Sequence, residues 1–256
     1  IIDSPNRAMV ELNSGDGLLT LAEGARIDLR HGTDDARVKA RPALYDGRER
    51  GTLDLYAPRI DGAGGAGTSA AATYGDIAID ASGRLDIRGA RSIAVNAVQR
   101  YADAEYGQVK GPNGQPVLDA NGRPVLDLSA DGRPYQVIDQ DYLNRKHGDS
   151  TAFIDKALAN ADLLNRKLAG LNNASYRDAF HLRPAVEIVS ATPDGAMVVS
   201  GDIDLSGYRY ASLNPHVQKT GVYGSGEPGA LAIRAGGNLS IYGLSLIHIS
   251  EPTRPY

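Results

Sequence analysis

The sequence predicts an all-β chain that folds as a parallel β-helix (β-solenoid), because one short apolar pattern recurs along it. Between residues 75 and 98, apolar residues stand in pairs on either side of a single residue, which is the period of two of a β-strand. The pairs are Ile77 and Ile79, Leu85 and Ile87, and Ile93 and Val95, each pair eight residues after the one before. Gly or polar residues separate the pairs, as the corners of a solenoid coil require.

The same pattern occurs near both ends of the chain, which makes it an internal repeat. Its members there, again at offsets of eight, are Leu19, Leu21, Ile27 and Leu29, and Leu231, Ile233, Leu239 and Ile241. The linkers 22–26, 80–84 and 234–238 each place Ala and then Gly before the next strand. An antiparallel β-sandwich is the alternative fold, because five-residue Gly linkers also suit hairpins.

Composition limits the class of protein. The 256 residues include 30 Gly, only 6% aromatic residues and no Trp, which suits a narrow interior filled by stacked aliphatic side chains. The formal net charge of −4 argues against a nucleic-acid partner, which a basic surface would favour. The absence of Cys excludes disulfides and thiolate metal sites. No apolar stretch reaches the roughly 18 residues of a transmembrane helix, so no transmembrane segment is expected.

The first predicted block of β-helix coils covers residues 1–99, with a polar loop at 31–50. Within it, Gly62, Gly64 and Gly67 match the G-x-G-x-x-G pattern of dinucleotide-binding turns. That chemistry requires a helix of ten or so residues after the glycines. Only residues 69–74 intervene before the next strand, so the pattern predicts a surface loop.

An insertion follows at residues 100–182. Its first part, 100–148, repeats an Asn-Gly or Asp-Gly pair with a Pro two residues later, which predicts an edge-type meander or a set of turns. A helix is then predicted at about 150–170, with Asp149 or Ser150 as its N-cap. Its apolar stripe is Ile154, Ala157, Ala161, Leu164, Leu168 and Leu171. We expect the stripe to be buried within the chain; a partner-binding helix is the alternative.

A second block of β-helix coils is predicted at residues 183–243. The polar excursion 207–228 within it carries Tyr208, Tyr210 and Tyr223, which form a candidate partner-binding loop because Tyr makes low-entropy contacts. Residues 244–256 are predicted to be a non-native tail, because 245–256 resemble a translated sequencing adapter. The chain is therefore expected to be an internal fragment of a longer protein.

Three segments, 180–188, 201–210 and 229–243, resemble the filamentous haemagglutinin family of two-partner-secreted bacterial exoproteins. The resemblance covers about residues 17–243, and the insertion at 100–182 departs from it. It implies a right-handed parallel β-helix that is exported through an outer-membrane transporter. It also implies a secreted or surface location on a Gram-negative bacterium, with a host-cell or bacterial surface glycan or protein as partner.

Catalytic chemistry is weakly indicated. Asp76, Asp80 and Asp86 lie close in sequence to Arg84 and Arg88, and carboxylates with arginines serve β-helix enzymes that cleave polysaccharides. All of them occupy outward positions of alternating strands, which are charged in any soluble solenoid. The five His residues are scattered, so no metal site, cofactor or catalytic residue is predicted.

The sequence therefore predicts a non-catalytic, structural and adhesive segment of a large bacterial exoprotein. One alternative is a β-helix polysaccharide lyase or hydrolase. The other is the stalk of a contact-dependent inhibition toxin whose toxic domain lies outside this chain.

Overall fold

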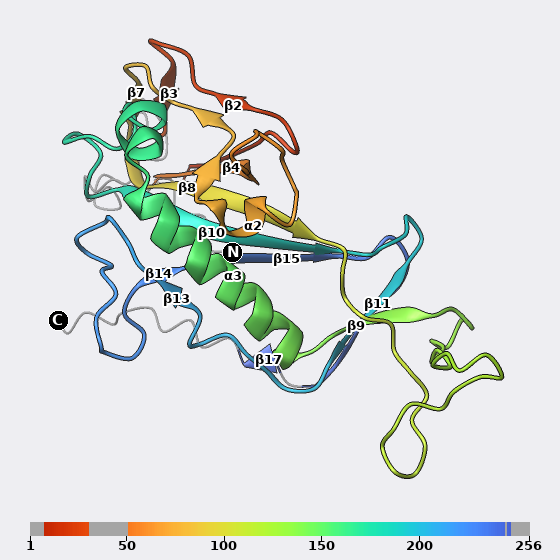
Figure 1. Cartoon of the computed structure of the whole chain (residues 1–256). Coiled ribbons are helices and arrows are strands. Elements are labelled where there is room, and N and C mark those ends of the chain that lie inside the picture. Colours follow the sequence, from red (N-terminus) through yellow and green to blue (C-terminus); the bar gives the residue numbers. More distant parts are fainter. Residues whose placement is uncertain (1–7, 31–50, 244, 247–256) are drawn as a thin grey trace, which may run out of the picture. The chain divides into compact units, whose positions relative to one another are not determined.

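The computed structural model describes residues 8–30, 51–243 and 245–246, and within them the chain is mostly β. The predicted loop at 31–50 and the last ten residues of the predicted tail lie outside the described residues. The largest sheet has the strand order β1 (Met9–Asn13), β4 (Gly51–Ile60), β8 (Ala90–Tyr101), β10 (Phe180–Val189) and β15 (Ala230–Arg234) (Figure 1). β5 (Asp76–Ile77) pairs with β4 off this path.

Parallel pairing explains the eight-residue repeat. β2 (Leu19–Thr20) pairs with β6 (Ile79–Asp80), and β3 (Arg26–Asp28) with β7 (Asp86–Arg88), both in parallel. Leu19 therefore lies opposite Ile79 and Ile27 opposite Ile87. β2 and β3 follow one another along the chain, as do β6 and β7. Each strand of the first pair lies beside its counterpart in the second pair. β1–β4 and β4–β8 are parallel too, so the antiparallel sandwich is wrong for these strands.

The chain divides into two compact units that interleave in sequence. Unit 1 comprises residues 1–99, 149–185 and 209–230, and unit 2 comprises 100–148, 186–208 and 231–256. In unit 1 the six inward side chains predicted between residues 75 and 98 are buried, at 0–8% exposure: Ile77, Ile79, Leu85, Ile87, Ile93 and Val95. They belong to one hydrophobic cluster, so the predicted inward face of these strands is confirmed. Leu19 and Ile27 of the first repeat are half-buried. The inward prediction is wrong for the last repeat, where Leu231, Leu239 and Ile241 are 39%, 43% and 63% exposed.

The predicted helix begins ten residues too late. Helix α3 spans Gln140–Ala159, and the Asp139 carboxylate accepts the N–H of Tyr142 at 2.8 Å, which caps its first turn. Asp149 and Ser150 are therefore not caps. After Asn160 the chain continues as the π-helix η2 (Leu163–Lys167). The apolar stripe did not predict this start, because its spacing of three and four residues does not continue through residues 140–149.

The stripe itself is buried in unit 1, with one exception. Ile154, Ala157, Leu164, Leu168 and Leu171 join the same cluster as the strand side chains. Ala161 is exposed, because α3 ends at Ala159 and the Asn160 side chain accepts the N–H of Leu163 at 3.1 Å, which starts a new turn. Most of the predicted stripe therefore packs within the chain.

A fully buried arginine of unit 1 contacts the part of α3 that belongs to the same unit, residues 149–159. The Arg59 guanidinium donates to the carbonyl of Ala72 at 2.7 Å, to that of Ala97 at 3.1 Å and to the Ser150 hydroxyl at 3.1 Å. It also lies 4.2 Å from the centre of the Phe153 ring. Strand β4, strand β8 and the helix are thereby joined by one side chain whose donors are satisfied in a low-dielectric site.

Unit 2 contains a parallel three-stranded sheet in the order β16 (Leu239–Tyr242), β11 (Ala196–Ser200) and β9 (Tyr135–Ile138). β12 (Ile203–Asp204) pairs in parallel with β17 (Ser245–Leu246). The β structure therefore extends two residues into the segment predicted to be a non-native tail. No helix among the described residues has the length and apolar character needed to cross a membrane.

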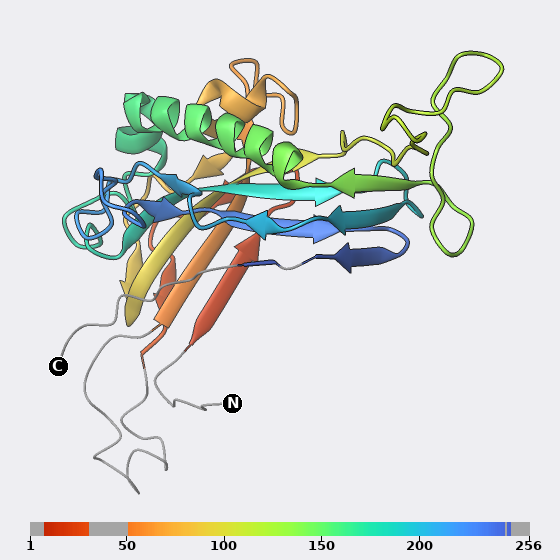
Figure 2. The same cartoon turned by 90° about the horizontal axis from the view of Figure 1, so that it is seen from below.

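The segment 107–134 of unit 2 forms three tight turns, as its Asx-Gly repeats predict (yellow-green in Figure 2). Gly114, Gly122 and Gly132 have φ of 76°, 75° and 76°, the left-handed region that favours glycine. The N–H of Val117 donates to the carbonyl of Val109, that of Val125 to Val117, and that of Val109 to Val125. These three bonds close a ring, so the segment consists of turns around a backbone ring and not of a regular meander.

Candidate binding groove

A groove of about 830 Å³ lies in unit 1, where a strand corner meets the chain that follows the π-helix. It is lined by parts of three segments, residues 23–24, 82–88 and 169–176. The second segment contains β7 and the Asp86–Arg88 part of the acidic and basic face noted in the sequence. The groove therefore brings together residues that the sequence places far apart.

Close backbone contact builds one wall of the groove. The N–H of Ala81 donates to the carbonyl of Lys167 at 2.7 Å, and that of Gly170 to the carbonyl of Ala81 at 2.8 Å. A Cβ at Gly170 would collide with the carbonyl oxygen of Gly83 and lie 2.6 Å from that of Ala81. Only glycine lets the two segments approach this closely.

Replacing Gly170 with Ala is expected to lower the free energy of unfolding by about 2 kcal/mol, because backbone atoms cannot yield as side chains do. Gly148 in α3 is the matched control, since a Cβ there meets no atom within 4 Å. Ala at that position is expected to stabilise the helix by up to about 1 kcal/mol. Urea unfolding of both variants checks this; equal effects would contradict the close contact at Gly170.

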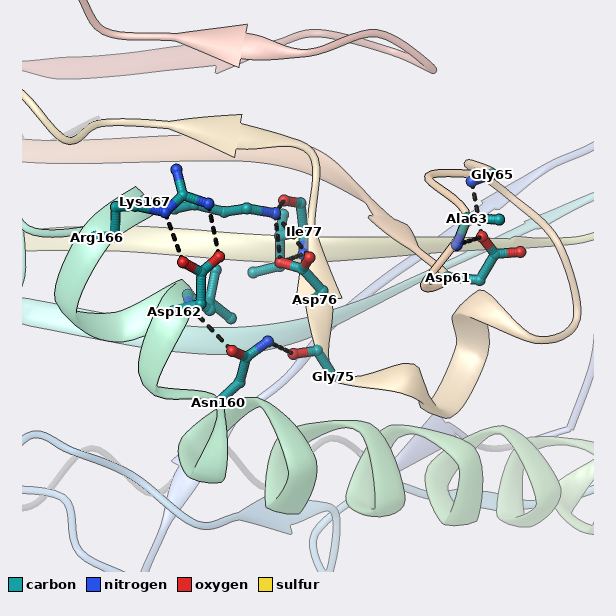
Figure 3. A network of polar contacts seen from close by, with 11 residues as sticks. Asp61, Ala63, Gly65, Gly75, Asp76, Ile77, Asn160, Asp162, Arg166 and Lys167 are labelled. Atoms are coloured by element: carbon teal, nitrogen blue, oxygen red, sulfur yellow. Dashed lines mark hydrogen bonds and ion pairs between the residues drawn. The ribbon is translucent and has the colours of Figure 1, made fainter.

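A network of ion pairs and hydrogen bonds holds the π-helix beside this corner (Figure 3). Lys167 Nζ lies 2.8 and 2.7 Å from the two carboxylate oxygens of Asp76, and both side chains are largely buried. The Asn160 side chain donates to the carbonyl of Gly75 at 3.0 Å. Asp162 and Arg166 pair along the helix. These contacts place residues 169–176 against the corner. No sequence motif predicts the contacts.

Tyr176 is fixed at the groove by its hydroxyl group. The hydroxyl donates to the carbonyl of Leu85 at 2.9 Å and accepts the N–H of Ile87 at 2.9 Å. One side chain thus satisfies a backbone carbonyl just before β7 and a backbone N–H within it. The ring of Tyr176 therefore has a preset position among the residues that line the groove.

The charges on β3 and β7 alternate. Arg26 lies opposite Asp86 and Asp28 opposite Arg88 in the parallel register. Within β7, Arg88 Nε donates to Asp86 at 2.7 Å, and this bond lowers the pKa of the Asp86 carboxyl and raises that of Arg88. Hydrogen bonding from Arg30 likewise lowers the pKa of Asp28. Both carboxylates are thus held ionised, whereas a general acid of glycoside cleavage needs a raised pKa.

Arg84 differs from the other groove charges. Its backbone N–H donates to the Glu23 carboxylate at 2.7 Å, but its exposed guanidinium has no hydrogen bond or ion pair within the described part of the chain. The Arg88 guanidinium is paired with the Asp86 carboxylate through Nε. The groove therefore carries two guanidinium groups and two carboxylates, those of Glu23 and Asp86, beside a fixed aromatic ring.

The glycine pattern at 62–67 forms a closed loop (Figure 3). The Asp61 carboxylate accepts the N–H groups of Ala63 at 2.9 Å and Gly65 at 2.8 Å, and so occupies donors that a dinucleotide-binding turn would offer to phosphate. Helix α2 after it has only four residues, Ala71–Tyr74. The loop is thus the surface turn that the sequence predicts.

The three tyrosines of the predicted partner-binding loop differ in setting. Tyr210 of unit 1 is 4% exposed and belongs to the hydrophobic cluster, whereas Tyr223 is 80% exposed. Tyr208 of unit 2 stacks on His147 at 4.3 Å, accepts a hydrogen bond from Gln140 at 2.9 Å and donates one to Asn144 at 2.8 Å. Of the three rings, only that of Tyr223 is mostly open to a partner.

A buried carboxylate anchors the segment that carries Tyr210 and Tyr223. Glu227 in β14 (Glu227–Pro228) is fully buried and pairs with Arg183, and with His181 Nδ1 at 2.9 Å. Ser212 donates to it at 3.1 Å. Sequence reasoning missed this cluster because its members are spread over residues 181–227.

Comparison with known proteins identifies no relative: no family model, no curated protein and no solved structure matches the chain. Among the described residues there is also no group of three or more His, Asp or Glu side chains able to hold a metal ion.

Proposed function

We propose that this chain is a right-handed parallel β-helix that serves as a non-catalytic, structural and adhesive segment of a large bacterial exoprotein. The observation that carries the proposal is the register in which Leu19 lies opposite Ile79 and Ile27 opposite Ile87. Such rows bury one aliphatic stripe per coil and leave outward positions free for display. The charged side chains of β3 and β7 beside them are paired with one another.

The proposal includes export through an outer-membrane transporter and a secreted or surface location on a Gram-negative cell. These parts rest on the resemblance of segments 180–188, 201–210 and 229–243 to the haemagglutinin family. The partner would be a glycan or a protein of a host-cell or bacterial surface. A long stack of parallel coils suits this role because each added coil extends the molecule without a new fold.

The test incubates the whole chain with neutral and acidic polysaccharides, with and without Ca²⁺, and follows binding and chain length in the same samples. We expect binding without shortening of any polysaccharide. Shortening that depends on Ca²⁺ would overturn the proposal in favour of a polysaccharide lyase. Circular dichroism in the same buffer confirms that the chain is folded during the assay.

A further inference from the structure

The last strands of unit 2 expose the kind of apolar row that their neighbours bury. β16 lies beside β11 in a parallel register that places Leu239 opposite Met197 and Ile241 opposite Val199. Met197 and Val199 are 0% and 7% exposed, whereas Leu239 and Ile241 are 43% and 63% exposed. The row on β16 is open because this strand ends its sheet among the described residues.

β15 likewise ends the large sheet, and its Leu231 is 39% exposed. Edge strands present unpaired backbone groups to other chains, and proteins commonly block such pairing with Pro, Lys or other charged side chains. Residues 230–234 and 239–242 contain neither Pro nor Lys, and Arg234 is their one charged residue. The edge is therefore suited to the addition of a further strand.

Charges beside this edge select the chemistry of the added strand. The guanidinium groups of Arg100 in β8 and Arg234 in β15 both pair with the carboxylate of Glu187 in β10, each through Nε at 2.9 Å. Positive and negative side chains thus alternate from strand to strand. The Arg234 side chain, at the end of this row, is 67% exposed. A strand that presents a carboxylate between two aliphatic residues continues both the charge row and the apolar row.

β1, at the opposite end of the large sheet, has this pattern. Its register with β4 places Val10 opposite Leu53 and Leu12 opposite Leu55, and both aliphatic side chains pack against the hydrophobic cluster. Glu11 lies between them and is exposed. One edge of β1 pairs with β4, and the other edge has no strand beside it within the described part of the chain.

We infer that β15 of one copy of this chain pairs in parallel with β1 of a second copy, so that copies associate head to tail. In this register Val10 lies beside Leu231 and Leu12 beside Ile233. The carboxylate between the two aliphatic residues then lies within reach of Arg234. β2 follows β1 as β16 follows β15, so the same pairing brings a strand to the open row on β16.

The contact joins two different edges, so each association leaves one edge of each kind open to a further copy. The inference goes beyond the proposed adhesive function and does not depend on it, because it uses only the two ends of one sheet.

Sedimentation velocity of the whole chain, from about 1 µM to about 100 µM, tests for association. We expect the mean sedimentation coefficient to rise with concentration. Leu231→Lys is expected to weaken association about tenfold or more, because pairing would bury an unpaired charge. Val222→Lys is the matched control, since Val222 is 72% exposed and lies on neither edge. Its association is expected to stay within about twofold of the parent's.

Disulfide cross-linking identifies the edges that meet, since the chain contains no Cys. Copies that carry Met9→Cys are mixed with copies that carry Ala230→Cys and then oxidised. These positions are opposite in the inferred register, where neighbouring strands bring Cα atoms within disulfide range, and their exchange leaves the aliphatic row intact. We expect a mixed dimer, and about tenfold less of it when Val222→Cys replaces Ala230→Cys.

A monomer at every concentration, in a chain that circular dichroism shows to be folded, would overturn the inference and leave the edge to a different partner. Equal weakening by Leu231→Lys and Val222→Lys would also overturn it. Cross-linking of Ala230→Cys copies with one another, without the mixed dimer, would mean that two β15 edges meet and would contradict the pairing with β1. None of these results bears on the adhesive function, which the polysaccharide assay tests separately.

Discussion

Ile87→Asp is expected to lower the free energy of unfolding by roughly 3–5 kcal/mol, because it places a carboxylate without a partner among aliphatic side chains. Ile87 is 8% exposed, lies opposite Ile27 and belongs to the hydrophobic cluster of unit 1. A charge in this row would disturb both stacked strands. Urea denaturation followed by far-ultraviolet circular dichroism measures the change.

Asp86→Asn is the matched control at the adjacent position. The Asp86 side chain is 40% exposed and pairs with an equally exposed Arg88, so its charge is screened by solvent. The variant is expected to unfold almost as the parent does. Comparable losses at residues 86 and 87 would contradict the assignment of alternate side chains to the interior and the surface.

Glu227→Gln is the second change with a large expected effect, about 3 kcal/mol of stability at pH 7. The carboxylate is fully buried, and removing its charge leaves the Arg183 guanidinium without its counter-ion. Glu105→Gln is the control, because Glu105 is exposed. Thermal unfolding at pH 7 compares the two variants.

The pH dependence of this effect has a definite sign. Hydrogen bonding from His181 and the charge of Arg183 outweigh desolvation and lower the pKa of Glu227 below its ordinary 4.5. A lowered folded pKa contributes stability above the unfolded pKa that is lost as pH falls through the folded value. The gap between parent and Glu227→Gln should therefore shrink below about pH 4.5. A gap independent of pH would mean that shape, and not charge, holds the cluster.

The strand pattern was predictable because alternation is a local property. The six apolar residues of the pattern between Ile77 and Val95 are buried as their spacing predicts, and the Asx-Gly pairs form turns at Gly114, Gly122 and Gly132. The mostly β character follows from the same signals. Local patterns also identified the apolar face of the helix, apart from Ala161.

The groove was not predictable, because it depends on contacts between distant segments. Residues 169–176 reach the strand corner only through the π-helix and the Lys167–Asp76 pair, and neither has a spacing signature. The start of α3 was missed because six polar or glycine residues, 144–149, separate the buried first-turn side chains of Tyr142 and Leu143 from the predicted stripe. Tyr210 looked like a loop residue, yet its ring is buried in the cluster.

The interleaving of the two units has a consequence for synthesis. Unit 1 draws on three separate stretches, the last of which ends at Ala230, and its buried carboxylate Glu227 belongs to that stretch. A nascent chain that ends near residue 99 lacks Phe153 and Glu227, two of the buried side chains of unit 1. High contact order of this kind slows folding and leaves early intermediates exposed. We therefore expect the growing chain to stay without its complete core until most of it has left the ribosome.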